Sequence, residues 1–296
     1  MSVYAVVCIN GEPMNIEEQY IKNVDELPSC PNIALEVLMI AQDVECNFQK
    51  LADKINRDPN LTANMLRMAN SVIYGYMRQI SSVKDMIVRL GLENVKLIAI
   101  TSATSTLLKP SKEAYGLAYG ALWRHSYATA VLASIIGRYA EVENGATLYT
   151  AALLHDVGKV ILDRPLQVEI LKRVPPEREM KFVDFEDYIL HTNHAKVGMA
   201  LLESWGLPDD ICIPVGYHHI RDMSVGADLN TKIVYLANLL IENMGLLLKD
   251  PEVYDFNVHD QEEPAEIMEG VPNFARNKEF IIDTFFEKYS DGLSFL

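Results

Sequence analysis

Apolar residues recur at helical spacing along most of the chain, and the strict alternation that is typical of strands is rare. Residues 4–9, in a short amino-terminal arm, could form an edge strand. The turn-forming residues at 27–31 precede a stripe of apolar residues, namely Ile33, Val37, Leu38 and Ala41. The same spacing predicts a second helix over 48–55. The pattern therefore predicts an all-α protein.

Capping residues mark both ends of the next predicted helix. Asp58 precedes Pro59, so an N-cap side chain stands directly before the residue type that is favoured at the first helical position. The core side of this helix is expected to consist of Leu61, Met65, Met68, Ala69 and Val72. Asn70–Ser71 is expected to end the helix through hydrogen bonds from side chain to backbone.

A corner between two further helices is predicted near residue 91. Ser82 and Asp85 resemble a capping box, and Gly91 stands where a left-handed residue would stop the helix. The next segment, 92–108, is predicted to be an amphipathic helix that is broken by Lys109–Ser111. We therefore expect a boundary between two helical subdomains at about residue 110.

The later part of the chain contains long helical patterns that are interrupted by Pro175–Pro176, Gly206–Pro208 and Gly226. The composition then turns acidic, and a last amphipathic helix is predicted over 277–289. The predicted organisation is an arm (1–22), an N-terminal helical subdomain (23–110), a second helical subdomain (111–245), and an acidic linker with a C-terminal helix (246–296).

Composition narrows the class of protein. With 296 residues, of which 49% are hydrophobic, the chain can bury a large core. No uncharged apolar run approaches the roughly 20 residues that cross a bilayer, and the first ten residues do not resemble a secretory signal. The cysteines are scattered, at Cys8, Cys30, Cys46 and Cys212. This scatter suits neither a disulfide framework nor a zinc knuckle, so we expect a cytoplasmic protein.

The charge of the chain bears on its partners. With 41 acidic and 26 basic side chains, the net charge is -15. Such a surface repels the phosphate backbone of nucleic acids and anionic membranes. We therefore expect neither direct nucleic-acid binding nor membrane binding, whereas a local basic pocket for a small phosphate ester is compatible with this charge.

Histidines gather in one part of the chain. Six of the seven lie between residues 125 and 219, which favours a set of metal ligands over random scatter. His155 and Asp156 are adjacent at the end of an apolar helical run, so that both would be buried at the end of a core helix. A divalent cation would let a buried imidazole and a buried carboxylate satisfy each other without the cost of an unpaired buried charge.

This pattern resembles the HD superfamily of metal-dependent phosphohydrolases. Members have an upstream histidine, a His-Asp pair, one or more later histidines and a final aspartate. The matching residues here are His125, His155, Asp156, His194, His218, His219 and, at the final position, Asn238. Asn238 departs from the pattern, and its neutral amide oxygen is a weaker ligand than a carboxylate. A metal ion that depends on it would be held less firmly.

A narrower resemblance comes from five motifs in register, which span about residues 23–220. They are Leu27–Pro31, Arg57–Thr62, Met68–Ser71, Leu90–Gly91 and Trp205–Pro208. Their order and spacing are similar to those of the HD-related output domain, or HDOD, a family of bacterial signalling and regulatory modules. The resemblance implies a multi-helix fold in which an N-terminal helical subdomain packs on an HD-type subdomain. The Gly-Tyr-Pro element of the HD-GYP phosphodiesterases is not found at 220–223.

The resemblance also implies roles for the site residues. One metal ion would be held by His125, His155, Asp156 and Asn238, and a second by Asp156, His194, His218 and His219. Asp156 would bridge the two ions, which in such sites lie roughly 3.5–4 Å apart and can activate water and clamp a phosphoryl group. The metal could be Fe, Mn, Zn, Ni or Mg.

Several residues have simpler interpretations. Lys159 could bind a substrate phosphate or act as a charge at a helix C-terminus, and the two are weighed equally. The doublet His218–His219 could cap a helix, although a ligand role is favoured. His191 is assigned no site role. Glu186 could orient His194 from the same helix face or be an ordinary exposed acid, and the exposed acid is favoured.

Two functions from different classes follow. In the first, the chain is a regulatory module of bacterial signal transduction, whose metal-binding site or cleft serves a signalling protein or a small phosphate-containing ligand. In the second, it is an active phosphohydrolase or phosphodiesterase on a nucleotide-like substrate, with Asp156 and Lys159 taking part in catalysis. The altered residue Asn238 and the missing Gly-Tyr-Pro element favour the module.

Overall fold

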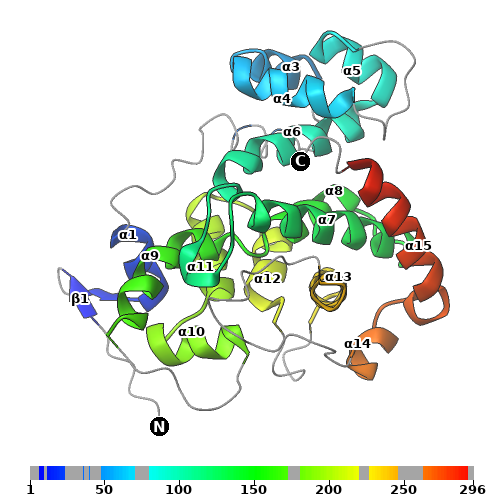
Figure 1. Ribbon diagram of the computed structural model, residues 1–296. Helices are drawn as coiled ribbons and strands as arrows, with labels where there is room; N and C mark the ends of the chain where they lie inside the picture. Colours follow the sequence, from blue (N-terminus) through cyan, green and yellow to red (C-terminus); the bar gives the residue numbers. More distant parts are fainter. Residues whose placement is uncertain are drawn as a thin grey trace.

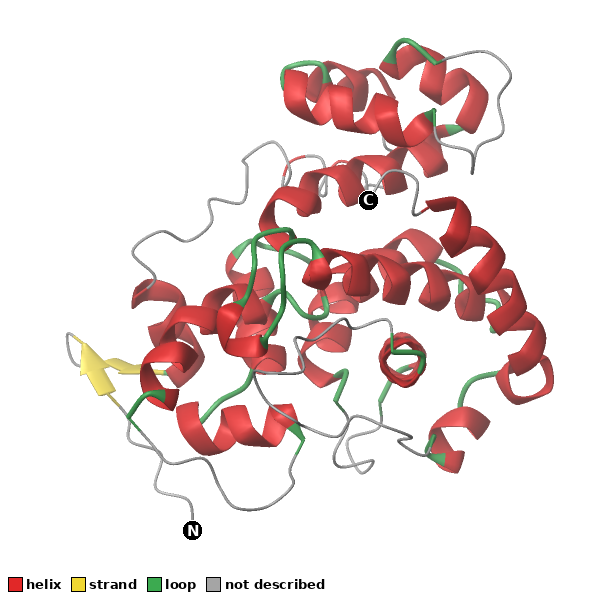
Figure 2. Cartoon of the chain, in the orientation of Figure 1, coloured by secondary structure: helices red, strands yellow, loops and turns green. Residues whose placement is uncertain are grey.

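The computed structural model describes residues 7–9, 12–23, 36, 40, 48–70, 80–172, 181–219, 227–245 and 263–292. Helices make up nearly all of the regular secondary structure in this part of the chain (Figure 2). The exception is an antiparallel hairpin of β1 (Val7–Ile9) and β2 (Glu12–Met14). The predicted edge strand is thus present over 7–9, and the strand that pairs with it was not predicted. The predicted turn at 27–31 lies outside the described residues.

Three helices that follow α1 (Ile16–Asn23) in the chain form a small lobe above the rest of the molecule (Figure 1). It contains α3 (Phe48–Ile55), α4 (Pro59–Ala69) and α5 (Val83–Leu90). Helix α6 (Leu92–Leu108) runs beneath this lobe, and α1 packs against the larger body. The bounds of α3 and α6 are those predicted from the hydrophobic pattern.

The larger body is built from nine α-helices and one 3₁₀ turn among the described residues (Figure 1). They are η2 (Glu113–Tyr115), α7 (Ala121–Tyr139), α8 (Gly145–Leu154), α9 (Gly158–Ile170), α10 (Phe182–Leu190), α11 (His194–Ser204), α12 (Asp209–Tyr217), α13 (Leu229–Asn243), α14 (Ala265–Glu269) and α15 (Phe274–Gly292). The predicted all-α class is confirmed, and the last helix begins three residues before its predicted start. None of the described helices is long and apolar enough to cross a bilayer.

The predicted caps of α4 are present. Oδ1 of Asp58 accepts hydrogen bonds from the backbone N–H groups of Asn60 and Leu61, at 2.8 and 3.1 Å. At the other end, the Asn70 amide exchanges hydrogen bonds with both the N–H and the carbonyl of Ile80. Asn70 therefore ends the helix and also fixes the start of the segment that leads to α5.

The corner between α5 and α6 also follows its prediction, with one difference. Ser82 Oγ accepts from the N–H of Asp85 at 3.0 Å, but the Asp85 carboxylate pairs with Arg89 at 2.7 Å. Gly91 has φ +78° and ψ 161°, a conformation that side chains with a Cβ rarely adopt. A glycine is therefore required here, although its ψ is extended and not left-handed helical.

Two clusters of buried hydrophobic residues lie on either side of α6. Val95, Ile98, Ala99 and Ala103 belong to the cluster of the small lobe. Ile100, Leu107 and Leu108 belong to the larger cluster of the body. The prediction of an amphipathic helix was therefore wrong for this segment, because both sides of α6 are covered by other helices. The predicted subdomain boundary near residue 110 stays a prediction.

The hydroxyl side chains of α6 are buried without loss of hydrogen bonds at three positions. Thr101, Thr104 and Ser105 each donate to a backbone carbonyl of the preceding turn. The Thr101 hydroxyl also lies 2.5 Å from the hydroxyl of Tyr149 on α8. This contact ties α6 to the helix that leads to His155.

Candidate metal centre

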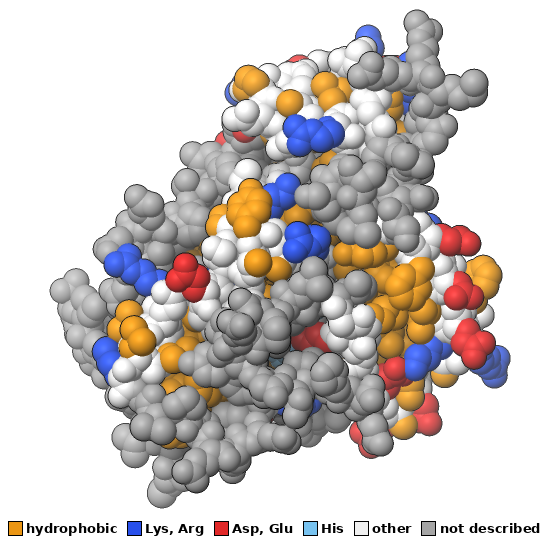
Figure 3. Space-filling model, viewed as in Figure 1, with side chains coloured by type: hydrophobic (Ala, Val, Ile, Leu, Met, Phe, Trp, Pro, Cys, Tyr) orange, Lys and Arg blue, Asp and Glu red, His pale blue; other side chains and the backbone are white. Residues whose placement is uncertain are grey.

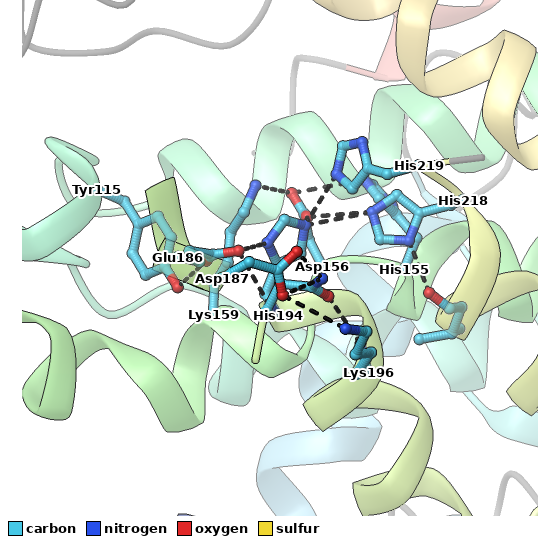
Figure 4. Close-up of polar contacts among 12 residues, drawn as sticks. Tyr115, His155, Asp156, Lys159, Glu186, Asp187, His194, Lys196, His218 and His219 are labelled. Carbon is cyan, nitrogen blue, oxygen red and sulfur yellow. Dashed lines mark hydrogen bonds and ion pairs between the residues drawn. The ribbon is translucent and has the colours of Figure 1, made fainter. Parts of the chain in front are cut away.

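The predicted ligands come from five helices and the turns that follow them. Figure 4 shows five of them converging, namely His155, Asp156, His194, His218 and His219. His125 lies on α7, His155 and Asp156 directly after α8, His194 at the first position of α11, His218 and His219 directly after α12, and Asn238 on α13. The structure brings the five histidines and Asp156 together and places Asn238 beside His125. His191 is exposed at the end of α10 and lies outside the site.

The chain reaches this arrangement through a close contact between α9 and α11. A Cβ placed on Gly158, the first residue of α9, would lie 1.9 Å from the carbonyl oxygen of His194 and 2.8 Å from the backbone nitrogen of Gly198. No side chain fits in that space. Glycine therefore allows the turn that carries Asp156 to lie against the beginning of α11, where His194 stands.

The first set of ligands, which we call the His125 group, consists of His125, His155 and Asp156. The Nε2 atoms of the two histidines lie 3.2 Å apart. Oδ2 of Asp156 lies 3.6 Å from Nε2 of His125 and 3.4 Å from Nε2 of His155. All three side chains are buried, with at most 1% exposed.

The second set, the His194 group, consists of His194, His218 and His219. Nε2 of His194 lies 3.3 Å from Nε2 of His218 and 3.0 Å from Nε2 of His219. The other carboxylate oxygen of Asp156, Oδ1, lies 3.2 Å from His194 and 3.8 Å from His218. Asp156 therefore stands between the groups, with one oxygen toward each.

Backbone carbonyls fix the tautomers of two of these histidines. Nδ1 of His155 lies 2.7 Å from the carbonyl oxygen of Ala152, and Nδ1 of His218 lies 2.7 Å from that of Val215. A carbonyl can only accept, so in each ring Nδ1 carries the proton and Nε2 presents a lone pair. These lone pairs point toward Nε2 of His125 and of His194, at 3.2 and 3.3 Å, and a metal ion among these nitrogens would accept them.

Glu186 fixes His194 in the same way. Its Oε2 accepts from Nδ1 of His194 at 2.6 Å and from the backbone N–H at 3.1 Å, while Oε1 accepts from the Tyr115 hydroxyl at 2.5 Å. Glu186 is fully buried, so the favoured interpretation as an exposed acid was wrong. So was the shared helix face, because α10 ends at Leu190 before α11 begins. Sequence spacing alone carries no signal for this contact.

Lys159 contacts Asp156 at Oδ2, the oxygen that faces the His125 group. Its Nζ lies 2.6 Å from Oδ2 of Asp156, and only 7% of the residue is exposed. The interpretation as a helix C-terminal charge was wrong, because the chain turns after His155 and places Lys159 in the first turn of α9. Phosphate binding by Lys159 stays a prediction.

Asn238 lies beside the His125 group and is 3% exposed. Its proximity to His125 favours the charged form of that ring. The Asn238 Oδ1 atom is buried without a hydrogen-bond partner in the described part of the chain, while Nδ2 contacts Glu242 at 3.4 Å. An unpaired buried amide oxygen is compatible with a metal ligand, and that role stays a prediction.

Burial keeps three of the imidazoles neutral. It lowers the pKa of His125 to about 3, although Asp156 opposes the shift, and it lowers the pKa of His218 and His219 well below the usual value. Burial also raises the pKa of Asp156, but Lys159 and His155 outweigh this effect and hold it well below its ordinary range. Neutral imidazoles around an ionised carboxylate are in the protonation states that bind a cation.

His194 differs from its neighbours. Burial lowers its pKa, but the carboxylates of Glu186 and Asp156 together outweigh burial, and the pKa is raised overall. Of the five histidines only His219 is partly exposed. On the face drawn in Figure 3, almost no histidine is visible among the described side chains. The donor atoms of the site fit a divalent cation. Among the five histidines, His219 is the one that solvent reaches.

Comparisons with known proteins identify the family of the chain. A family model described as HDOD domain matches residues 27–221, about two thirds of the chain. A curated relative, an uncharacterized protein of Treponema pallidum, is 21% identical over 198 residues. The match covers 66% of this chain but only 38% of that relative, so the chain spans well under half of its length.

Three solved structures share the fold. An HDOD domain protein of unknown function from Geobacter sulfurreducens has a TM-score of 0.76 and 25% identity, covering 95% of this chain and 97% of that one. A candidate phosphohydrolase from Shewanella amazonensis has a TM-score of 0.69 and 17% identity, and the match covers 94% of this chain and 98% of that one. A candidate signal transduction protein from Marinobacter aquaeolei has a TM-score of 0.65 and 19% identity, and the match covers 96% of this chain and 60% of that one. By the extent of the family match, the chain is a member of the HDOD family.

Proposed function

We propose that the chain is a metal-binding regulatory module of signal transduction. The observation that carries this proposal is the approach of the Nε2 atoms of His218 and His219 to within 3.3 and 3.0 Å of Nε2 of His194. Three imidazole nitrogens of a buried site do not approach so closely unless a proton or a metal ion lies among them. Asp156 supplies the negative charge that such an ion requires.

The chemistry of the donors indicates which ions fit. The His194 group would hold one ion with Oδ1 of Asp156, and the His125 group would hold a second with Oδ2 and the amide oxygen of Asn238. Imidazole donors suit Fe, Zn and Ni, whereas Mg and Mn prefer oxygen ligands such as the Asp156 carboxylate. A bound ion of this kind polarises phosphoryl oxygens and lowers the pKa of coordinated water.

Three features favour a regulatory module over an enzyme. Asn238 offers a neutral ligand at the His125 group, Lys159 occupies an oxygen of Asp156 at 2.6 Å, and only His219 of the five histidines is partly exposed. A substrate would have little access to the metal ions. The partner would be a signalling protein or a small phosphate-containing ligand, in line with the name of the Marinobacter relative.

A phosphohydrolase is the second candidate, because one observation favours it. Asp156 directs one oxygen to each group of histidines, at 3.2 Å to His194 and 3.4 Å to His155. A bridging carboxylate is the arrangement by which two metal ions clamp a phosphoryl group. The Shewanella relative is named as a candidate phosphohydrolase, which is the same class of enzyme.

Metal binding is tested first. Three chelator-treated proteins would be titrated with Mn²⁺ or Zn²⁺ by calorimetry: wild type, Asp156→Ala and His191→Asn. His191 is an exposed histidine outside the site in a left-handed conformation, which asparagine tolerates. We expect wild type and His191→Asn to bind alike and Asp156→Ala to lose at least one ion. A wild-type protein that binds no ion would contradict the proposal.

Turnover separates the two candidate functions. The metal-loaded wild type and Asp156→Ala would be assayed with phosphomonoesters, nucleotides and cyclic dinucleotides. A regulatory module predicts no turnover in either protein. Hydrolysis that the wild type performs and Asp156→Ala does not would overturn the module in favour of the phosphohydrolase.

A further inference from the structure

We propose that the two groups of ligands bind metal with unequal affinity, the His194 group first and tightly, the His125 group second and only when Lys159 gives up its contact with Asp156. This inference rests on the proposed function, since it assumes that both groups bind metal. It adds a regulatory property, because the state with two ions then forms only at higher metal concentration.

The His194 group has a supporting shell that is charged. The Glu186 carboxylate binds both Nδ1 and the backbone N–H of His194, at 2.6 and 3.1 Å, and is itself held by the Tyr115 hydroxyl at 2.5 Å (Figure 4). A carboxylate behind a histidine ligand fixes the ring and makes its Nε2 a stronger donor, and losing such a partner typically costs about 10–100-fold in metal affinity. Glu186 and Tyr115 are therefore positioning residues.

The His125 group has no comparable support among the described residues. Nδ1 of His125 has no hydrogen-bond partner there, and Nδ1 of His155 contacts only the neutral carbonyl of Ala152. Its further ligand would be the amide of Asn238, which carries no charge. The two groups share the Asp156 carboxylate, and backbone carbonyls fix His155 and His218 alike. What the His125 group lacks is a charged partner such as the Glu186 carboxylate behind His194.

Lys159 adds a direct competitor. Its ammonium group lies 2.6 Å from Oδ2 of Asp156, the oxygen that faces His125 and His155, and no other carboxylate contacts Nζ among the described residues. A divalent cation in the His125 group must share that oxygen with a positive charge or displace it. Among the described residues Lys159 donates its hydrogen bond to Oδ2 and none to Oδ1, the oxygen that faces the His194 group, so Lys159 opposes a metal ion mainly in the His125 group.

The test measures binding of Mn²⁺ alone by calorimetry, with metal content checked by mass spectrometry. Wild type should bind two ions in two steps whose dissociation constants differ by at least about 10-fold. Lys159→Met should tighten the second step by about 10-fold or more and leave the first unchanged. Glu186→Gln should weaken the first step by about 10–100-fold. Lys196→Met, which removes an exposed lysine outside the site, should match wild type.

Folding of the variants is followed in parallel. Lys159→Met leaves the buried carboxylate of Asp156 without its partner, so the metal-free variant should melt at a lower temperature and gain more from Mn²⁺ than wild type does. Lys159→Gln, which keeps a polar side chain, serves as the second variant should Lys159→Met fail to fold. Signals of coupled Mn²⁺ pairs in electron paramagnetic resonance should appear at lower metal concentration in these variants.

The outcomes distinguish this inference from the proposed function. A wild-type protein that binds no Mn²⁺ would defeat the proposed function itself. Two ions that bind with equal affinity, or a second step that neither Lys159 variant alters, would overturn the inference while metal binding stood. A weaker first step in Glu186→Gln, together with a tighter second step in the Lys159 variants, would support it.

Discussion

Replacing Gly158 by alanine adds one methyl group at the contact between α9 and α11. The new Cβ would lie 1.9 Å from the His194 carbonyl oxygen, whereas real Cβ atoms essentially never come closer than 3.0 Å to such an atom. The obstacle is backbone and cannot rotate away. One of the two helices must therefore move by about 1 Å or more, given ordinary van der Waals limits.

The size of that movement decides its effect on the metal centre. Asp156 precedes Gly158 by two residues and His194 begins α11, so the shift acts on the 3.2 Å separation between Asp156 Oδ1 and His194 Nε2. Functional sites tolerate displacements of only about 0.5 Å. We expect at least about 10-fold weaker Mn²⁺ binding. Overpacking of this kind costs about 1–3 kcal/mol, which lowers the melting temperature by about 2–10 °C in a chain of this size.

The assay compares Gly158→Ala with Gly145→Ala by differential scanning fluorimetry and by calorimetric titration with Mn²⁺. Gly145 opens α8, and a Cβ there would meet nothing within 4 Å. The control should keep the melting temperature and the metal affinity of wild type. If Gly158→Ala behaved like the control in both measurements, the inferred role of this contact in holding His194 against Asp156 would be wrong.

Three other predictions concern separate parts of the molecule. Asp58→Ala removes the N-cap of α4 and should lower the free energy of unfolding in urea by about 0.5–2 kcal/mol; an unchanged midpoint would contradict this. Burial raises the pKa of the Cys212 thiol to about 11, so a variant with only this cysteine should resist alkylation at pH 8. Because the folded pKa lies above the ordinary value of 9.0, the stability that the protonated thiol contributes is complete below pH 9 and is lost as the pH rises through 11; the effect should vanish in Cys212→Ala. Chelation should lower the melting temperature of metal-loaded protein, because an ion at 100 times its dissociation constant contributes about 2.7 kcal/mol; identical melting curves would count against a bound ion.

Local signals in the sequence predicted local structure well. The N-cap at Asp58, the stop at Asn70 and the glycine corner at Gly91 depend on residues only a few positions apart, and all three are present. The bounds of α6 were predicted for the same reason. Its burial on both sides was not, because it depends on helices that are distant in sequence.

The candidate site shows the same division. The histidines and Asp156 were identified from the sequence because their residue types and their spacing match the family pattern. The fold brings these side chains together. The pairing of Lys159 with Asp156 depends on the turn after α8, and the burial of Glu186 depends on how α10 meets α11. Neither the turn nor the packing has a periodic signature, so both contacts had to come from the structure.

Helix α6 has a consequence for how the molecule comes apart. Its residues Ile98 and Ile100 belong to different hydrophobic clusters, so neither cluster is complete when this one helix is removed. Loss of the small lobe would expose one side of α6 to water, and loss of the body would expose the other. We therefore expect the lobe and the body to unfold as one cooperative unit, in which the contact between Thr101 and Tyr149 connects α6 to the helix that ends at the metal ligands.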